Sequence, residues 1–151
     1  MTKPDEIPDE IMERIGRGIE LQQQGERAAA RTLFAGLWNE IGETGDALHR
    51  CALAHWMADV QDDLRAELTW DLRALDAAGS IEAFYPSLHL NLGEVYRKLG
   101  DRQKAAEHLA LGRAGVNALD DDGYGYGYGY GKMIIQGLDG LKARLAAAAI
   151  S

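Results

Sequence analysis

Three small residues recur along this chain, and each is followed at fixed offsets by two further apolar positions. The small residues are Gly18, Ala54 and Gly93. An alanine stands twelve residues after each of them and a large apolar residue four residues later, giving the series Ala30, Ala66, Ala105 and the series Phe34, Trp70, Leu109. These constant offsets, at successive periods of 36 and 39 residues, indicate three copies of one structural unit.

Each unit is predicted to be a pair of antiparallel helices. Apolar residues in the third unit follow the three-and-four spacing of one helix face, at Leu88, Leu92, Val95 and Leu99. The Gly100-Asp101 step that follows is expected to end one helix and cap the next. Turns are also expected at Gly25-Glu26 and at residues 61–63. A small residue at a crossing lets two helices come close, and the large residue fills the space beside the contact.

The composition favours an all-α protein. Alanine, leucine, glutamate, arginine and glutamine are abundant and form helices readily. Only three valines occur, which disfavours a large β-sheet. With 151 residues the chain is about one domain in length. We therefore predict an α-solenoid of three antiparallel helical hairpins plus a C-terminal capping helix.

The same patterns set the expected boundaries. Residues 1–10 form a polar tail, and the three repeats span about 11–44, 45–80 and 81–119. A Gly-Tyr connector then covers 120–131, and the capping helix covers 132–151. The last helix carries a stripe formed by Ile134, Leu138, Leu141 and Leu145. Arrays of repeats need such a terminal helix to cover the apolar face of the final unit.

The third unit, LHLNLGEVYRKLGDRQKAAEHLALGRAG, resembles the tetratricopeptide repeat, a family of helix–turn–helix units. The positions that match the family are Leu92, Gly93, Tyr96, Gly100, Asp101, Ala105 and Leu109. The units also differ from the family pattern in three ways. The usual tryptophan position holds Arg14, Arg50 and His89, no unit has the closing proline, and both periods exceed the family's usual length of about 34 residues.

The resemblance implies that a ligand binds on the concave surface formed by the first helix of each pair. Its expected lining residues are Ile15, Ile19, Gln22, Cys51, His55, Asp59, Leu90, Glu94, Arg97 and Lys98. One end of this set is apolar and the other is charged, which suits an extended or helical peptide with an apolar anchor. Two other interpretations stay open: the residues form ordinary solvated surface, or the last helix of the chain covers them.

Other classes of function find little support in the sequence. The net charge of −8 repels nucleic acid and anionic membranes. His55 and Asp59 lie one helical turn apart, but two ligands from one helix do not make a metal site. We find no catalytic or phosphate-binding motif, so we expect no enzyme activity, no metal and no cofactor. One cysteine, no signal peptide and no long apolar run favour a cytoplasmic protein.

The leading hypothesis is therefore a module that binds a protein or peptide partner, whose identity the sequence does not give. The alternative is a self-associating structural or scaffold protein. It would use the low-complexity Gly-Tyr tract, with Tyr124, Tyr126, Tyr128 and Tyr130, or a capping helix swapped between two copies in a homodimer. A weaker alternative is a regulator that senses a peptide or a small ligand.

The Gly-Tyr tract gives a first test. Glycine at every second position favours a flexible connector, so deleting residues 124–131 should leave the mass measured by light scattering unchanged. If the tyrosines pair two copies instead, the same deletion lowers that mass from dimer to monomer.

Overall fold

The computed structural model describes residues 9–79, 84–118 and 128–150. These residues form seven α-helices and no strand, which confirms the prediction of an all-α protein. The helices are α1 (Glu10–Gln23), α2 (Arg27–Ile41), α3 (Ala47–Asp59), α4 (Leu64–Ala78), α5 (Tyr85–Lys98), α6 (Arg102–Ala118) and α7 (Tyr128–Ile150).

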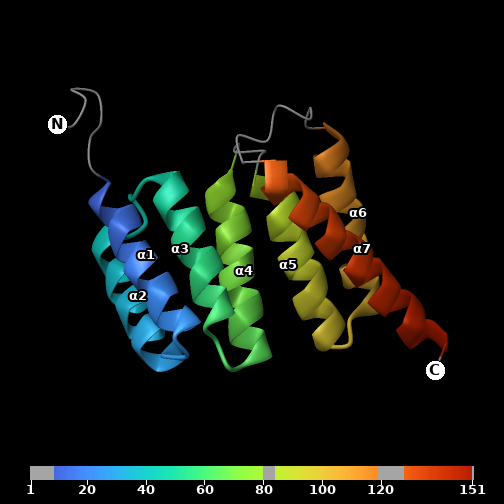
Figure 1. Cartoon of the computed structure of the whole chain (residues 1–151), viewed down its shortest axis with the longest axis horizontal. Coiled ribbons are helices and arrows are strands. Elements are labelled where there is room, and N and C mark those ends of the chain that lie inside the picture. The colour runs from blue at the N-terminus through green and yellow to red at the C-terminus, as the bar shows by residue number, and fades with distance from the viewer. Residues whose placement is uncertain (1–8, 80–83, 119–127, 151) are drawn as a thin grey trace.

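The helices pack in neighbouring pairs that follow one another along the long axis of the molecule (Figure 1). Helix α1 packs on α2, α3 on α4, and α5 on α6, while α2–α3 and α4–α5 contacts join one pair to the next. Helix α7 packs on both α5 and α6, so it covers the last pair.

The predicted turns lie between helices. Gly25 and Gly100 have φ angles of 84° and 89°, a region that favours glycine. Residues 61–63 separate α3 from α4. Asp101 begins α6 as expected: its Oδ1 accepts a hydrogen bond of 3.0 Å from the amide of Lys104. Asp9, Asp46 and Asp63 cap α1, α3 and α4 in the same way.

The close helix contact predicted for the first pair is present. A β-carbon added to Gly18 would lie only 2.2 Å from a ring atom of Phe34, so the phenyl ring sits directly on the glycine. Both Phe34 and Ala30 are fully buried in the first core cluster. In the second pair, Ala54 is buried and Trp70 packs against its cluster.

The third pair differs from the prediction. A β-carbon on Gly93 would lie 3.4 Å from the carbonyl oxygen of Ala105, so α5 and α6 do approach closely there. The space over the glycine, however, is filled by Leu141 of α7, whose Cδ2 would be 2.5 Å from that β-carbon. The predicted filler, Leu109, only packs against the edge of the same cluster. The reason is that the last pair has an additional helix on its open side.

Helix α7 is held by leucine–glycine contacts in both directions. Leu138 packs on Gly112 of α6 in the way that Leu141 packs on Gly93, and Gly137 of α7 lies under Leu90 of α5.

Helix α7 begins at Tyr128, four residues before the expected start, so part of the predicted connector is helical. Extending an anchored helix costs far less free energy than nucleating one, even through glycines.

Among the described residues, no helix has the length and apolar character needed to cross a membrane.

The glycine contacts predict opposite effects for two neighbouring substitutions. Gly18→Ala should lower the free energy of unfolding by about 1–3 kcal/mol, because the new methyl group meets the Phe34 ring. Gly16→Ala, on the same helix with open space around it, should raise that free energy by up to about 1 kcal/mol. Urea unfolding measures both, and equal effects would contradict the close contact.

Candidate functional site

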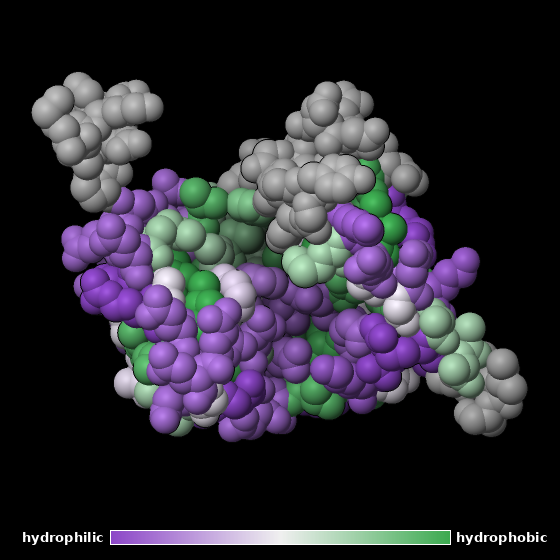
Figure 2. Space-filling view, in the orientation of Figure 1, coloured by the Kyte–Doolittle hydropathy of each residue, from purple (hydrophilic) through white to green (hydrophobic). Residues whose placement is uncertain are grey.

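A small pocket opens between α3 and the start of α5. Its volume is about 120 Å³, and its lining is mostly apolar. Four residues come from α3 and three from the start of α5 or just before it: Cys51, Ala52, His55, Trp56, Phe84, Ser87 and Leu88. Figure 2 shows apolar patches in the upper part of the face that it displays and smaller ones among the polar surface below.

A hydrogen bond between α3 and α5 lies directly beyond the pocket. Asn91 Nδ2 donates to His55 Nδ1 at 3.0 Å. Burial lowers the pKa of His55, although the carboxylate of Asp59 opposes the shift. The imidazole is therefore neutral near pH 7, which leaves Nδ1 able to accept this bond.

A cluster of charged side chains continues along the same helices. Asp59 stands one turn beyond His55 on α3, Glu67 and Asp71 come from α4, and Lys98 comes from α5. Burial raises the pKa values of Asp59 and Glu67, while the ammonium of Lys98 lowers both. The guanidinium of Arg27 also lowers the pKa values of Asp59 and Glu67. We call Asp59, Glu67, Asp71 and Lys98 the acidic cluster.

Asp71 is the most unusual member of the acidic cluster. It is 3% exposed, and no hydrogen bond to its carboxyl group occurs within the described part of the chain. Burial, reinforced by the neighbouring carboxylates of Glu67 and Asp59, raises its pKa to about 8. The group is therefore largely protonated at neutral pH, which avoids the cost of a buried charge.

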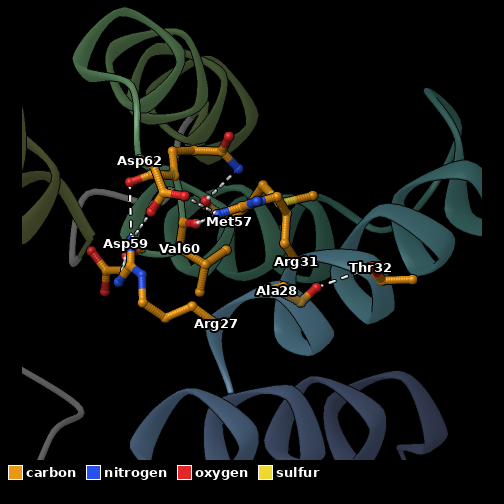
Figure 3. A network of polar contacts seen from close by, with 9 residues as sticks. Arg27, Ala28, Arg31, Thr32, Met57, Asp59, Val60 and Asp62 are labelled. Atoms are coloured by element: carbon orange, nitrogen blue, oxygen red, sulfur yellow. Dashed lines mark hydrogen bonds and ion pairs between the residues drawn. The ribbon is translucent and has the colours of Figure 1, made fainter. Parts of the chain in front are cut away.

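The turn that ends α3 is held by two arginines of α2 (Figure 3). Arg27 donates to the carbonyl oxygens of Asp59 and Gln61, both at 3.0 Å. Arg31 donates to the carbonyl of Val60 at 2.8 and 3.1 Å and to the carboxylate of Asp62 at 2.9 Å. These bonds satisfy carbonyl groups at and just after the end of α3 and fix the end of the helix that carries Asp59.

The predicted lining residues divide into three groups. The first group meets at the pocket and the acidic cluster and consists of Cys51, His55, Asp59 and Lys98. Burial raises the pKa of the Cys51 thiol to about 11, so it stays a neutral thiol. We call the pocket, the His55–Asn91 bond and the acidic cluster together the α3–α5 site.

The second group belongs to α1, and it contributes less to an exposed binding surface than expected. Ile15 is fully buried in the first core cluster, so the prediction that it lines a binding surface is wrong. Its side chain points toward Phe34 and Leu37 of the same cluster because it lies on the apolar stripe that joins α1 to α2. Ile19 packs half-buried against that cluster, and the Oε1 atom of half-buried Gln22 has no hydrogen-bond partner among the described residues.

The third group lies against α7. Leu90 contacts Gly137, and Glu94 forms ion pairs with Arg144 of α7 and with Arg97 one turn away. Leu90 and Glu94 therefore contact the last helix, as the second interpretation of these residues expected. They serve the docking of α7 rather than an open surface.

Sequence reasoning missed the contribution of α4. Glu67 and Asp71 are spaced with Ala74 and Ala78 at intervals of four, three and four, which is a buried stripe. Two acidic residues on an otherwise apolar stripe were the available signal. The prediction considered only the first helix of each pair, so it overlooked this stripe.

Two further expectations concern the rest of the chain. Tyr124 and Tyr126 lie outside the described residues, and Tyr128 and Tyr130 begin α7 with side chains that are not described. The proposed role of the tract in self-association thus stays a prediction. Over the described ranges, no group of three or more histidine, cysteine, aspartate or glutamate side chains is arranged to hold a metal ion.

Comparison with known proteins adds no assignment. No family model, curated protein or solved structure matches this chain.

The buried carboxyl group predicts a dependence of stability on pH. Between pH 4 and 8 the folded protein keeps a proton on Asp71 that the unfolded chain, with a pKa of 3.8, releases. The free energy of unfolding contributed by Asp71 therefore falls as pH rises through this window. Asp71→Asn removes this effect. The free energy of unfolding of the variant, minus that of the parent, should therefore increase by on the order of 3 kcal/mol from pH 5 to pH 8.

Urea unfolding of both proteins at the two pH values measures this gain. His89, whose pKa is lowered to about 4, titrates in the same range with the opposite sign, but it is present in both proteins and cancels. Asp76→Asn, at an exposed position of α4, is the matched control and should show no such gain. A stability difference for Asp71→Asn that is equal at both pH values would contradict the account.

Proposed function

We propose that this protein is a helical-repeat interaction module of the tetratricopeptide type, a short α-solenoid that binds a segment of another protein at the α3–α5 site. The single observation that carries the proposal is the apolar pocket of Cys51, Trp56 and Phe84 placed next to polar and charged groups on the same two helices. Such a site offers an anchor for one side chain and partners for polar groups of the bound segment.

The size of the pocket favours a peptide over a small-molecule ligand. Pockets for small ligands commonly have volumes of about 300–1,000 Å³. A volume of 120 Å³ suits one aliphatic side chain instead. The remainder of the binding free energy would then come from contacts along α3 and α5 outside the pocket, as in recognition of an extended segment or a helix.

The repeat pattern supports the solenoid arrangement that the proposal needs. In Figure 1 the helices stand in a row, with α3 and α4 between the first pair and the third. Helix α3 contacts α1, and His55 reaches Asn91 of α5. Helix α7 packs on both helices of the third pair, as the first helix of a fourth pair would in such an array.

A pocket-blocking variant tests the proposal. Ser87→Trp places a large ring at the mouth of the pocket, whereas Thr69→Trp adds the same ring on the exposed side of α4. Both variants should keep the circular dichroism of the parent. Proteins captured from an extract of the native cells by the parent and by Thr69→Trp should be lost with Ser87→Trp.

Quantitative mass spectrometry compares the three captures. Proteins retained equally by the parent and both variants would contradict binding at the α3–α5 site.

A further inference from the structure

We propose that His89 and His108 form an acid-sensitive contact between α5 and α6, and that its opening on mild acidification releases α7 from these two helices. We call these two residues the histidine pair. The proposal concerns the last three helices and does not depend on the proposed function. Three features support it: the contact between the two rings, the charges around them, and the position of α7 at the same helix crossings.

The two imidazole rings face each other through one nitrogen each. Nδ1 of His89 lies 2.9 Å from Nδ1 of His108, and the ring centroids are 5.2 Å apart. A neutral imidazole carries a proton on one nitrogen only, so one ring donates a hydrogen bond here and the other accepts it. Two protonated rings would instead place two N–H donors and two positive charges against each other. The contact therefore requires at least one neutral ring.

Aromatic side chains extend the histidine pair along α5. The ring of Tyr85 lies beside that of His89, with the centroids 5.9 Å apart. The ring of Tyr96 lies nearly parallel to that of His108, at 5.4 Å and 9°. The ammonium group of Lys104 stands 5.3 Å from the centroid of the Tyr96 ring. Both histidine rings are half-buried in this arrangement, so a charge on either of them is poorly hydrated.

The charged groups around the histidine pair are mostly cations. Burial lowers the pKa of His108; the carboxylate of exposed Glu107 opposes this shift, and the ammonium of Lys104 adds to it. Burial and the neighbouring His108 lower the pKa of His89 to about 4. From α4, the charged residue that lines the adjoining cleft is Arg65, another cation. Both histidines are therefore neutral near pH 7, and the folded state resists their protonation.

Helix α7 sits on the same two helix crossings as the histidine pair. At each crossing, a leucine of α7 and one of the two histidines approach the same glycine. The β-carbon that the glycine lacks would lie 2.9 or 2.5 Å from the leucine Cδ2 and 3.6 or 3.8 Å from the histidine Cβ. The residues are Leu138, Gly112 and His89 at one crossing, and Leu141, Gly93 and His108 at the other. Separation of α5 from α6 would therefore displace both leucines.

Acid could also act on α7 through its ion pairs. Glu94 of α5 binds Arg144 of α7, and Arg113 of α6 binds Asp139 of α7. Carboxyl groups commonly titrate near pH 4, whereas histidines commonly titrate near pH 6.5. A comparison of pH 7 with pH 5 therefore separates the histidine pair from these ion pairs.

Amide hydrogen exchange of the full chain at pH 7 and pH 5 tests the proposal. Opening hydrates both rings, which then bind protons near the ordinary histidine pKa of 6.5, so acid favours the open form. Protection factors, corrected for the intrinsic pH dependence of exchange, should fall by about tenfold or more in α7. They should change by less than about twofold in α1 and α2, which belong to a separate pair.

Nitrogen-15 chemical shifts of the imidazole rings report the contact itself. At pH 7 one member of the histidine pair should carry its proton on Nδ1 and the other on Nε2. Two rings that both carry the proton on Nε2 would contradict the contact. This measurement uses the unaltered chain, so it does not depend on how well any variant folds.

A double variant separates the histidine pair from other acid effects. His89→Asn with His108→Asn places two amides near the positions of the Nδ1 atoms and removes both titrating groups, so α7 should lose its response between pH 7 and pH 5. His49→Asn is the matched control, because His49 contacts Asp9 at the start of α1. Its α7 should respond as in the parent. Circular dichroism at pH 7 checks that both variants keep their helices.

Two results would overturn the proposal. A response of α7 that persists in the double variant would assign the effect to the ion pairs instead. An equal fall of protection in all helices of the parent would show that the histidines lower only the global stability, without a separate release of α7.

Discussion

Contact between a large side chain and a glycine on the neighbouring helix determines the arrangement of this molecule. The ring of Phe34 rests on Gly18 in the first pair, and Leu141 and Leu138 rest on Gly93 and Gly112 in the last. Because no β-carbon intervenes, the helix axes come close and the large side chains become fully or almost fully buried.

The α3–α5 site departs from this close packing. Elsewhere the buried residues of the described chain are apolar or small, but Asp71 is a buried acid on the stripe of α4 that carries Ala74 and Ala78. A leucine or alanine at that position would stabilise the pair more readily, because it would bury no polar group. Arg27 and Arg31 keep the neighbouring end of α3 in place.

The helices, their turns and their capping aspartates could be predicted because periodicity and capping are local properties of the sequence. The positions of Leu109 and Leu141 could not, since the packing of α7 on Gly93 depends on the geometry of two other helices. The same packing covers Leu90 and Glu94. Two of the four residues of the acidic cluster, Asp59 and Lys98, were named from α3 and α5, and the other two lie on α4, where only the polar residues of a buried stripe pointed to them.

The most direct test of the central claim, binding at the α3–α5 site, is a map of the contact surface on the intact protein. Amide chemical shifts from nuclear magnetic resonance would be recorded while a captured partner segment is added. The account predicts that the largest changes fall on residues 51–59 of α3, on the first half of α5, and on the amides around Asp71. Changes confined to α6, to α7 or to the exposed side of α4 would contradict it.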